Sequence, residues 1–327
     1  VMNTADKLLY LLIQADGWVS GELIAQSLGM TRTSIWKSVQ KLEAQGHTIE
    51  SVRGQGYRYV EGAKISVAGI EKYLKQHVNL EVFDTIDSTN IYAKEKLGSR
   101  EINETTVLVA EQQTGGVGRL GRQFFSPKDT GLYVTFALPL DSHSAVNPGR
   151  LTTSTAVATS KMVKELFNID LEFKWVNDLI YHNRKVGGIL TEGTIDIESQ
   201  QFSSLAVGVG MNLAVPATGF PETISQKAGA LVDKLTVSRN QVVATLINHF
   251  FDMYADYQDG RYIDQYRQHV VGIGQQVEVQ RGQTHINGVI KEIDENGRLV
   301  VDTETGLAYI NSGEITKLML PNNGYKG

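Results

Sequence analysis

The chain has 327 residues, enough for two or three domains. Its 31 basic and 36 acidic residues give a formal net charge of −5, so any nucleic-acid contact must come from a local basic patch. The sequence has no cysteine, which excludes disulfides, thiol catalysis and cysteine-ligated metal centres, and its seven histidines show no metal-ligand spacing. No apolar run is long enough to span a bilayer and no signal-peptide pattern is visible, so we expect a cytoplasmic protein without a membrane partner.

The first 62 residues predict a winged helix-turn-helix domain. Leucines at helical spacing indicate a first helix over residues 4–15, and Ser20 and Thr31 are good N-caps for two more helices. Two short strands follow, over residues 48–52 and 57–60, joined by a glycine-tipped turn. Three helices followed by such a hairpin are typical of this DNA-binding fold.

The outward face of the third predicted helix, together with the turn of the hairpin, carries polar and basic side chains suited to DNA. Between residues 31 and 58 the chain has five basic and two acidic residues. A small helical docking module with a solvated polar face is the alternative interpretation. The predicted DNA-binding residues are Arg32, Thr33, Ser34, Trp36, Lys37, Gln40 and Arg53.

A second domain is predicted over residues 66–270, after a short linker. Ser66 to His77 predicts a short helix, and Val82 to Ile86 predicts a strand. The string Asp87-Ser88-Thr89-Asn90 then offers several capping groups to the helix that follows. Capping alone explains these residues, but hydroxyls at a helix N-terminus are also suited to a polar ligand.

The stretch from Ala110 to Pro127 reads A-E-Q-Q-T-G-G-V-G-R-L-G-R-Q-F-F-S-P and lies between two strand-like runs, Thr105–Val109 and Leu132–Leu138. Glycine lets the backbone approach a ligand closely, and Arg119 and Arg122 offer planar donors for carboxylate or phosphate. The spacing G-x-G-x-x-G is present, but a strand or turn follows it instead of the helix that the dinucleotide-binding fingerprint requires. We therefore predict a cationic loop that encloses an anionic ligand; a plain surface hairpin is the alternative.

The rest of this domain predicts further strands and helices. A long helix is expected over Arg150–Phe167, and two more over Val237–Tyr257 and Arg261–His269. The strand-like runs between them carry three motifs: K-W-V-N-D at 174–178, R-K-V-G-G-I-L-T-E at 184–192 and G-V-G-M-N-L at 208–213.

Residues 271–327 predict a third domain, a small SH3-like β-barrel. Apolar and polar residues alternate in four segments, and Asn296-Gly297 is a hairpin turn signal. The predicted strands are Gln276–Gln280, His285–Ile293, Leu299–Asp302 and Leu307–Ile310.

Five motifs, namely D-S-T-N, the glycine-rich loop and the three strand motifs, thus stand in one order between a winged helix and a small barrel. In this order, over essentially the whole chain, the sequence resembles the bifunctional biotin–protein ligases that also repress the biotin operon. The resemblance implies an α+β multidomain fold whose central domain is a mixed-sheet, biotin/lipoate-ligase-like catalytic domain. It also implies an enzyme that uses ATP and Mg²⁺ to form biotinyl-5′-AMP and then transfers biotin to a lysine of an acceptor domain, typically of acetyl-CoA carboxylase. As a repressor, such a protein would bind operator DNA as a homodimer favoured by the adenylate.

The resemblance further implies the site residues. Biotin would contact Ser88, Thr89, Asn90, Gln113, Gly116, Arg119, Lys185, Gly188, Gly208 and Gly210. ATP and the adenylate would contact Arg119, Arg122, Phe124, Lys174, Asn177, Lys185 and Asn212. The implied catalytic residues are Lys185, at the α-phosphate, with Arg119, Arg122 and Asp178, the last of which would orient or deprotonate the incoming lysine. No protein ligand to a metal is implied, since Mg²⁺ would accompany ATP.

The sequence departs from the family pattern at three positions. Val117 replaces an arginine of the loop, Phe124 replaces a tryptophan, and Val176 replaces the proline of K-W-P-N-D. The cation missing at position 117 favours a second hypothesis, a regulator whose ligase-like domain only senses biotin or its adenylate. A third hypothesis is a lipoate or octanoate ligase, which shares the catalytic fold but normally lacks a DNA-binding head.

Overall fold

The computed structural model describes residues 3–62, 64–141 and 146–319 of the chain. The chain forms two compact units, one of residues up to His77 with Thr236–Thr245, and the other of Val78–Leu235 with Leu246 onward. Each unit is described by itself. Among the described residues, no helix is both long and apolar enough to cross a membrane.

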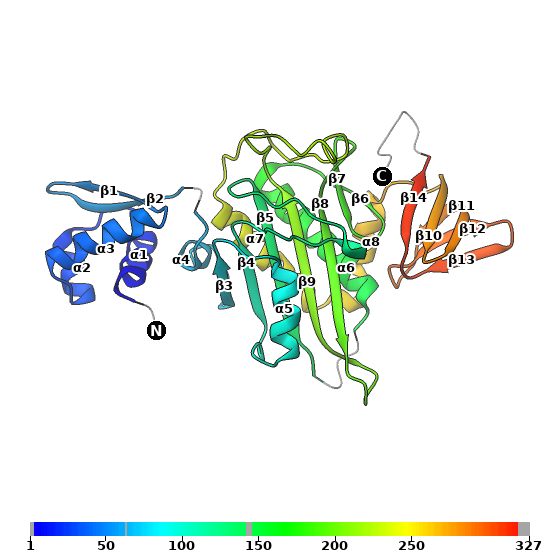
Figure 1. Ribbon diagram of the computed structural model, residues 1–327, viewed down its shortest axis with the longest axis horizontal. Helices are drawn as coiled ribbons and strands as arrows, with labels where there is room; N and C mark the ends of the chain where they lie inside the picture. Colours follow the sequence, from blue (N-terminus) through cyan, green and yellow to red (C-terminus); the bar gives the residue numbers. More distant parts are fainter. Residues whose placement is uncertain (1–2, 63, 142–145, 320–327) are drawn as a thin grey trace. The chain divides into compact units, whose positions relative to one another are not determined.

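The first unit contains the predicted winged helix-turn-helix (Figure 1). Side-chain caps start its helices where the sequence predicts them: Ser20 Oγ accepts a hydrogen bond from Leu23 N at 3.1 Å, and Thr31 Oγ1 accepts one from Ser34 N at 3.2 Å. The core of this unit consists of buried apolar side chains, among them Leu8, which recurs at helical spacing with its neighbours in α1. The elements are α1 (Thr4–Ala15), α2 (Gly21–Leu28), α3 (Arg32–Ala44), β1 (Thr48–Val52) and β2 (Gly56–Val60).

The helix predicted over Ser66–His77 is shorter in the structure. Ser66 caps it as expected, but α4 covers only Val67–Glu71. Beyond it the backbone turns on bonds from Tyr73 N to Ile70 O and from Leu74 N to Glu71 O. These three-residue turns replace the four-residue repeat of an α-helix and so end it.

The second unit is built on a seven-stranded mixed sheet with the order β3-β4-β5-β9-β8-β7-β6. Only β3 and β4 run parallel, and every other neighbouring pair is antiparallel. The strand predicted at Val82–Ile86 lies earlier in the chain, because β3 pairs in register from Asn79 to Phe83 with Thr106–Ala110. The strands are β3 (Asn79–Phe83), β4 (Thr106–Ala110), β5 (Gly131–Pro139), β6 (Glu172–Lys174), β7 (Asp178–Tyr181), β8 (Arg184–Ile195) and β9 (Phe202–Asn212).

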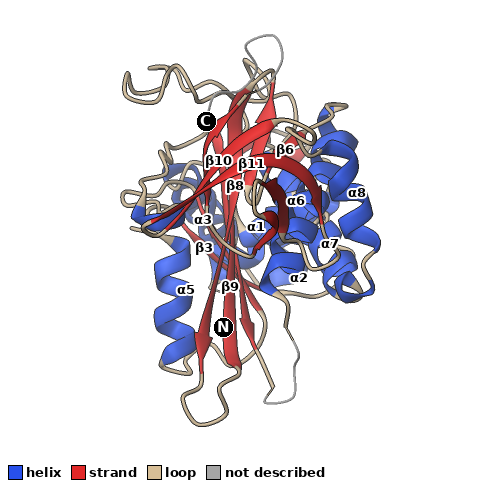
Figure 2. Cartoon of the chain, turned by 90° about the vertical axis from the view of Figure 1, so that its right-hand side faces the viewer, coloured by secondary structure: helices blue, strands red, loops and turns tan. Residues whose placement is uncertain are grey.

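Helices cover both faces of this sheet (Figure 2). On one face lies α5 (Thr89–Gly98), whose Ala93 and Leu97 pack in a buried cluster with strand residues such as Leu108. On the other face Phe136 of β5 stacks on Phe250, with ring centroids 3.5 Å apart. The helices of that face are α6 (Pro148–Phe167), α7 (Arg239–Tyr254), whose first turns belong to the first unit, and α8 (Arg261–His269).

The C-terminal part of the second unit is a five-stranded antiparallel sheet with the order β13-β12-β11-β10-β14, which confirms a small β domain. The sequence analysis missed its last strand, β14. This five-residue strand pairs with β10, nearly 40 positions back along the chain, across a register shift at Glu278 and Val279. The strands are β10 (Gln276–Arg281), β11 (Thr284–Ile293), β12 (Leu299–Thr303), β13 (Gly306–Ile310) and β14 (Glu314–Leu318).

Candidate active site

A cavity of about 300 Å³ opens in the second unit over β5, β8 and β9. It brings together the D-S-T-N helix start, the glycine-rich loop and the three strand motifs, which are far apart in the sequence. Apart from Gly116, every residue predicted to contact biotin or nucleotide lines this cavity. Gly116 lies just outside the lining, where its carbonyl accepts a hydrogen bond from Phe124 N at 2.8 Å.

One end of the cavity is a network of hydroxyl and amide groups. Thr89 donates from both its backbone N (2.9 Å) and its Oγ1 (3.1 Å) to Gln113 Oε1. Gln113 in turn donates from Nε2 to Ser126 Oγ at 3.0 Å. The hydroxyl of Thr135 lies 2.8 Å from both Thr89 Oγ1 and Asn90 Oδ1. These side chains are therefore held in place before any ligand arrives.

Glycines on β9 keep this wall open. A Cβ at Gly208 would lie 2.3 Å from Asn90 Oδ1, and one at Gly210 would lie 2.8 Å from the ring of Phe124. A side chain at either position would force Asn90 or Phe124 to move, so glycine is what this arrangement of the wall accommodates. The wall can then take the flat side of a ligand against bare backbone.

The glycine-rich loop folds as a tight hairpin around a short turn, η1 (Arg119–Gly121). Gly118 N donates to Arg122 O at 2.7 Å, which closes the turn. Leu120 adopts a positive φ of 57° and its side chain is 76% exposed. The exposed Leu120 and the two arginines of the loop, Arg119 and Arg122, all lie at the edge of the cavity.

The two loop arginines have different partners. Arg119 is half-buried, and its Nη1 donates to Asn177 Oδ1 at 3.4 Å. Burial lowers the pKa of Arg119, although a guanidinium stays charged at any physiological pH. Arg122 forms an ion pair with Glu314 of β14, with 2.6 Å between Nη2 and Oε2.

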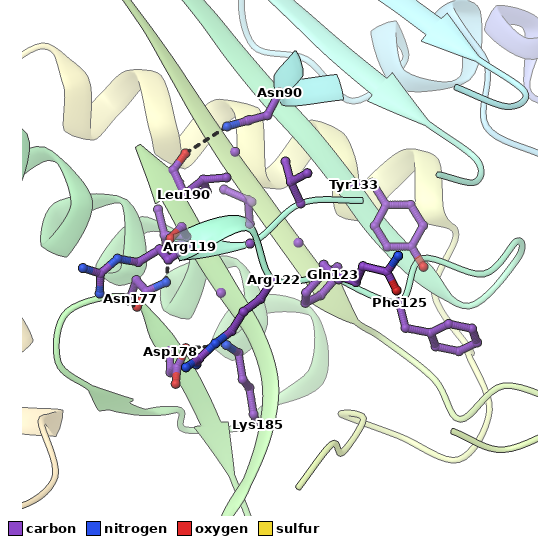
Figure 3. Close-up of a pocket in the computed structure, with 18 of the residues that line it drawn as sticks. Asn90, Arg119, Arg122, Gln123, Phe125, Tyr133, Asn177, Asp178, Lys185 and Leu190 are labelled. Atoms are coloured by element: carbon purple, nitrogen blue, oxygen red, sulfur yellow. Dashed lines mark hydrogen bonds and ion pairs between the residues drawn. The ribbon is translucent and has the colours of Figure 1, made fainter. Parts of the chain in front are cut away.

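Lysines and Asp178 form the opposite, cationic end of the cavity. Figure 3 shows Lys185 and Asp178 facing each other, and their Nζ and Oδ1 atoms lie 2.5 Å apart. Lys174 is buried nearby, and burial lowers its pKa despite the opposing effect of the Asp178 carboxylate. The Trp175–Val176 peptide bond between these residues is cis.

Asn177, Asn212 and Phe124, the predicted nucleotide contacts that would surround adenine, make contacts within the protein. Asn177 donates from Nδ2 to Ile189 O at 3.1 Å, and Asn212 donates from Nδ2 to Gly229 O at 3.0 Å. The ring of Phe124 meets that of Tyr133 edge-on, with centroids 6.5 Å apart. Side chains held in this way form a preorganised pocket, and their contact with adenine stays a prediction.

The sequence analysis missed several residues that line the cavity. They come from the middle of β5, from the connection between β9 and α7, and from β14. No local motif marks them, since each reaches the cavity through strand pairing or loop packing. They are Tyr133, Thr135, Ile224, Lys227, Ala228, Glu314 and Ile315.

Two carboxylates, those of Asp178 and Glu314, line the cavity. In the part of the chain that the structure describes, no group of three or more His, Asp or Glu side chains could hold a metal ion. Magnesium commonly binds through substrate phosphates with only one or two carboxylates.

In the first unit, α3 presents the predicted DNA-binding face. The side chains of Arg32, Lys37 and Gln40 are exposed, and so is Arg53 in the hairpin. Trp36 is 57% exposed on the same helix, which is unusual for so large an apolar side chain. An exposed indole between cations is suited to packing against a partner.

Comparison with known proteins agrees with this arrangement. Residues 82–212 match the biotin/lipoate A/B protein ligase family, residues 4–58 match an HTH domain, and residues 272–318 match the biotin protein ligase C-terminal domain. The bifunctional ligase/repressor BirA of Bacillus subtilis is 30% identical, over 94% of this chain and 97% of the relative. The chain belongs to the biotin protein ligase family.

Other relatives of this biotin protein ligase support the same assignment. BirA of Escherichia coli is 27% identical, over 96% of this chain and 97% of its own length. The structure of the biotin protein ligase from Aquifex aeolicus in complex with biotin and ATP matches with a TM-score of 0.58 at 26% identity, and the match covers 72% of this chain and 97% of that one.

Proposed function

We propose that this biotin protein ligase activates biotin with ATP to biotinyl-5′-AMP, transfers biotin to a lysine of an acceptor domain, and represses transcription in response to biotin. The observation that carries this proposal is one cavity with a neutral hydrogen-bonding end and a cationic end, in a chain that also has a winged helix. Biotin has the matching ends, a cyclic urea and a carboxylate.

The neutral end suits the urea ring. The hydroxyls of Ser88, Thr89 and Thr135 and the amide of Gln113 can donate to the urea oxygen and accept from its N–H groups. These side chains are already oriented by one another, so little conformational freedom is lost on binding. The apolar body of biotin would then lie along the β9 backbone at Gly208, one of the glycines that a side chain would block.

The cationic end suits the reacting groups. In the first step a biotin carboxylate oxygen attacks the α-phosphorus of ATP, the bond to the β-phosphate breaks, and pyrophosphate leaves. Negative charge builds on the α-phosphate during this step, and Lys185 and Arg119 would stabilise it. No protein nucleophile is needed, because the substrate carboxylate itself attacks.

The second step gives Asp178 a role. The acceptor lysine attacks the acyl carbon of the adenylate, AMP leaves, and the attacking nitrogen must lose a proton. Asp178 lies in the cavity beside Lys185, at 2.5 Å. When a phosphate takes Lys185 as its partner, the carboxylate becomes free to orient the incoming amine or accept its proton.

The acceptor is a lysine-bearing domain of a biotin-dependent enzyme such as acetyl-CoA carboxylase, and the DNA partner is an operator bound through α3. A single winged helix reads few base pairs, so specific binding calls for two copies on a two-fold site. We propose a homodimer favoured by biotinyl-adenylate. Support comes from the exposed basic face of α3 and its covalent link to a ligand-binding unit.

Acceptor labelling tests the enzymatic part of the proposal. The full chain is incubated with ATP, Mg²⁺, biotin and a biotin-acceptor domain, and the acceptor is weighed by mass spectrometry. We expect the acceptor to gain the mass of one biotinyl group, and to gain nothing when lipoate or octanoate replaces biotin. An unmodified acceptor after prolonged incubation would overturn the ligase assignment.

The alternative is a regulator that only senses biotin or its adenylate, and Val117 in the loop favours it. This residue lines the cavity at a position where the family resemblance leads us to expect a cation. A pure sensor would bind operator DNA in a biotin-dependent manner while leaving the acceptor unmodified, so the same labelling experiment separates the two functions.

A further inference from the structure

The connection between β9 and α7 borders the cavity, although no predicted site residue lies in it. Its backbone is tied to the start of β8. Lys185 N donates to Lys227 O at 2.8 Å, and Gly229 N donates to Lys185 O at 2.8 Å. Lys227 is thus bonded through its backbone to the lysine that would act on the reacting phosphate.

Side chains hold this connection as well. Arg184 donates from Nη1 to the carbonyls of Ser225 (2.7 Å) and Ala228 (3.2 Å). From the other side, Asn212 Nδ2 donates to Gly229 O at 3.0 Å. With bonds on both flanks, the Lys227 side chain projects from a fixed base, and it is part of the cavity lining.

The charges of the cavity single out Lys227. Five cationic side chains line it, against the carboxylates of Asp178 and Glu314. Asp178 is paired with Lys185 and Glu314 with Arg122. Lys227 is exposed and forms no salt bridge with any residue that the structure describes.

The charge of Lys227 also acts inside the site. Burial is the main reason why the pKa of Lys174 is lowered, and the positive charges of Lys185 and Lys227 lower it further. An anion bound among these three lysines would interact with all of them. Such a cluster of cations is suited to a polyphosphate.

We propose that Lys227 is a further phosphate-binding residue, one that holds the β- and γ-phosphates of the nucleotide and the pyrophosphate that leaves. This inference rests on the proposed function. When the α–β bond breaks, its electron pair leaves with pyrophosphate, which gains negative charge. Lys185 and the buried Lys174 lie deeper and would stay with the adenylate, whereas the exposed Lys227 meets the departing group.

The test uses the full chain and the variants K227Q, K227R and K234Q. Lys234 is a matched control, since it is an exposed lysine of the same connection that does not line the cavity. Biotin-dependent exchange between ATP and labelled pyrophosphate measures the first step. We expect K227Q to raise the KM for ATP and for pyrophosphate about 10-fold, in keeping with one lost charge-assisted hydrogen bond. K227R and K234Q should behave as the unsubstituted protein.

A second readout separates phosphate binding from a structural role. Chemically supplied biotinyl-5′-AMP is given to each variant, and transfer of biotin to the acceptor is followed. K227Q should transfer at the unchanged rate, because no pyrophosphate is involved. Equal loss in both assays, or an unchanged KM for ATP and pyrophosphate in K227Q, would overturn the inference. Absence of biotin-dependent exchange in the unsubstituted protein would instead overturn the proposed function, and the inference with it.

Discussion

Lys185 is the second residue of β8, where its Nζ lies 2.5 Å from Asp178 Oδ1 and its side chain is 35% exposed. Lys185→Ala should lower the rate of adenylate formation about 100-fold or more, because it removes a cation from the developing charge. Biotin-dependent pyrophosphate release measures this. Thermal unfolding is the control and should change little, since the side chain is not buried. Unchanged pyrophosphate release would remove Lys185 from the mechanism.

Val117 leaves the loop with one cation fewer than the family resemblance implies. Val117→Arg should slow dissociation of biotinyl-5′-AMP by about 10- to 100-fold, in keeping with one added charge-assisted hydrogen bond. Stopped-flow or filter-binding release measures the rate. If release is unchanged, Arg119 and Arg122 already supply the charge that the adenylate requires.

We expect Lys174 to make ATP binding sensitive to alkaline pH. Burial lowers its pKa below the ordinary value of 10.5, so it loses its proton at a lower pH than an exposed lysine. Since the protonated form would bind phosphate, the affinity for ATP should fall as the pH rises through this lowered pKa. Lys174→Arg keeps its charge and should move the alkaline loss of affinity to higher pH. Identical alkaline profiles for the two proteins would show that Lys174 does not contact the nucleotide.

At the scale of elements, we expect the glycine-rich loop to be ordered by its ligands. Its turn is closed by Gly118 N and its tip residue Leu120 is exposed. Amide hydrogen exchange over residues 114–124 should slow at least 10-fold when biotin and ATP are added, because bound anion would give the arginines partners and order the backbone. Exchange that is equal with and without ligands would make the loop a static hairpin.

The starts of the helices were predictable because the signals that set them lie close by in the sequence. Ser20, Thr31 and Ser88 start their helices as predicted, because an N-cap bonds to an amide only three residues away. Glycines at 208 and 210 were also recognisable, since they interrupt a run of apolar strand residues. By contrast, β14 escaped prediction, because its five residues are defined by pairing with β10 rather than by their own pattern.

At the scale of the whole molecule, ligand binding, dimerisation and DNA binding should be linked. If biotinyl-adenylate favours the dimer and the dimer favours DNA, each step strengthens the other. Sedimentation with and without biotin and ATP should show a ligand-driven rise in mass. The affinity for operator DNA should rise in parallel. Tight operator binding by a ligand-free monomer would contradict this linkage.

The two activities should also be separable by substitution. Arg32→Ala or Lys37→Ala should weaken DNA binding and lower its salt dependence, since each would remove a proposed phosphate contact of α3. Biotin transfer to the acceptor should be unchanged, because both residues belong to the first unit and every cavity-lining residue belongs to the second. Loss of biotin transfer in these variants would contradict the assignment of DNA binding and catalysis to separate domains.

The sequence by itself determined the winged helix, the central mixed-sheet domain and the small β domain, most helices and strands, and the motifs that meet in the cavity. These features follow from helix caps, hydrophobic periodicity and ordered motifs, and each such signal lies within a short stretch of consecutive residues. Only the tertiary structure decided that Lys185 pairs with Asp178, that Arg122 reaches Glu314 from 192 positions away, and that Lys227 joins the cavity. Such contacts depend on how strands pair and loops pack. The residues next to each member of a distant pair do not indicate which residue its partner is.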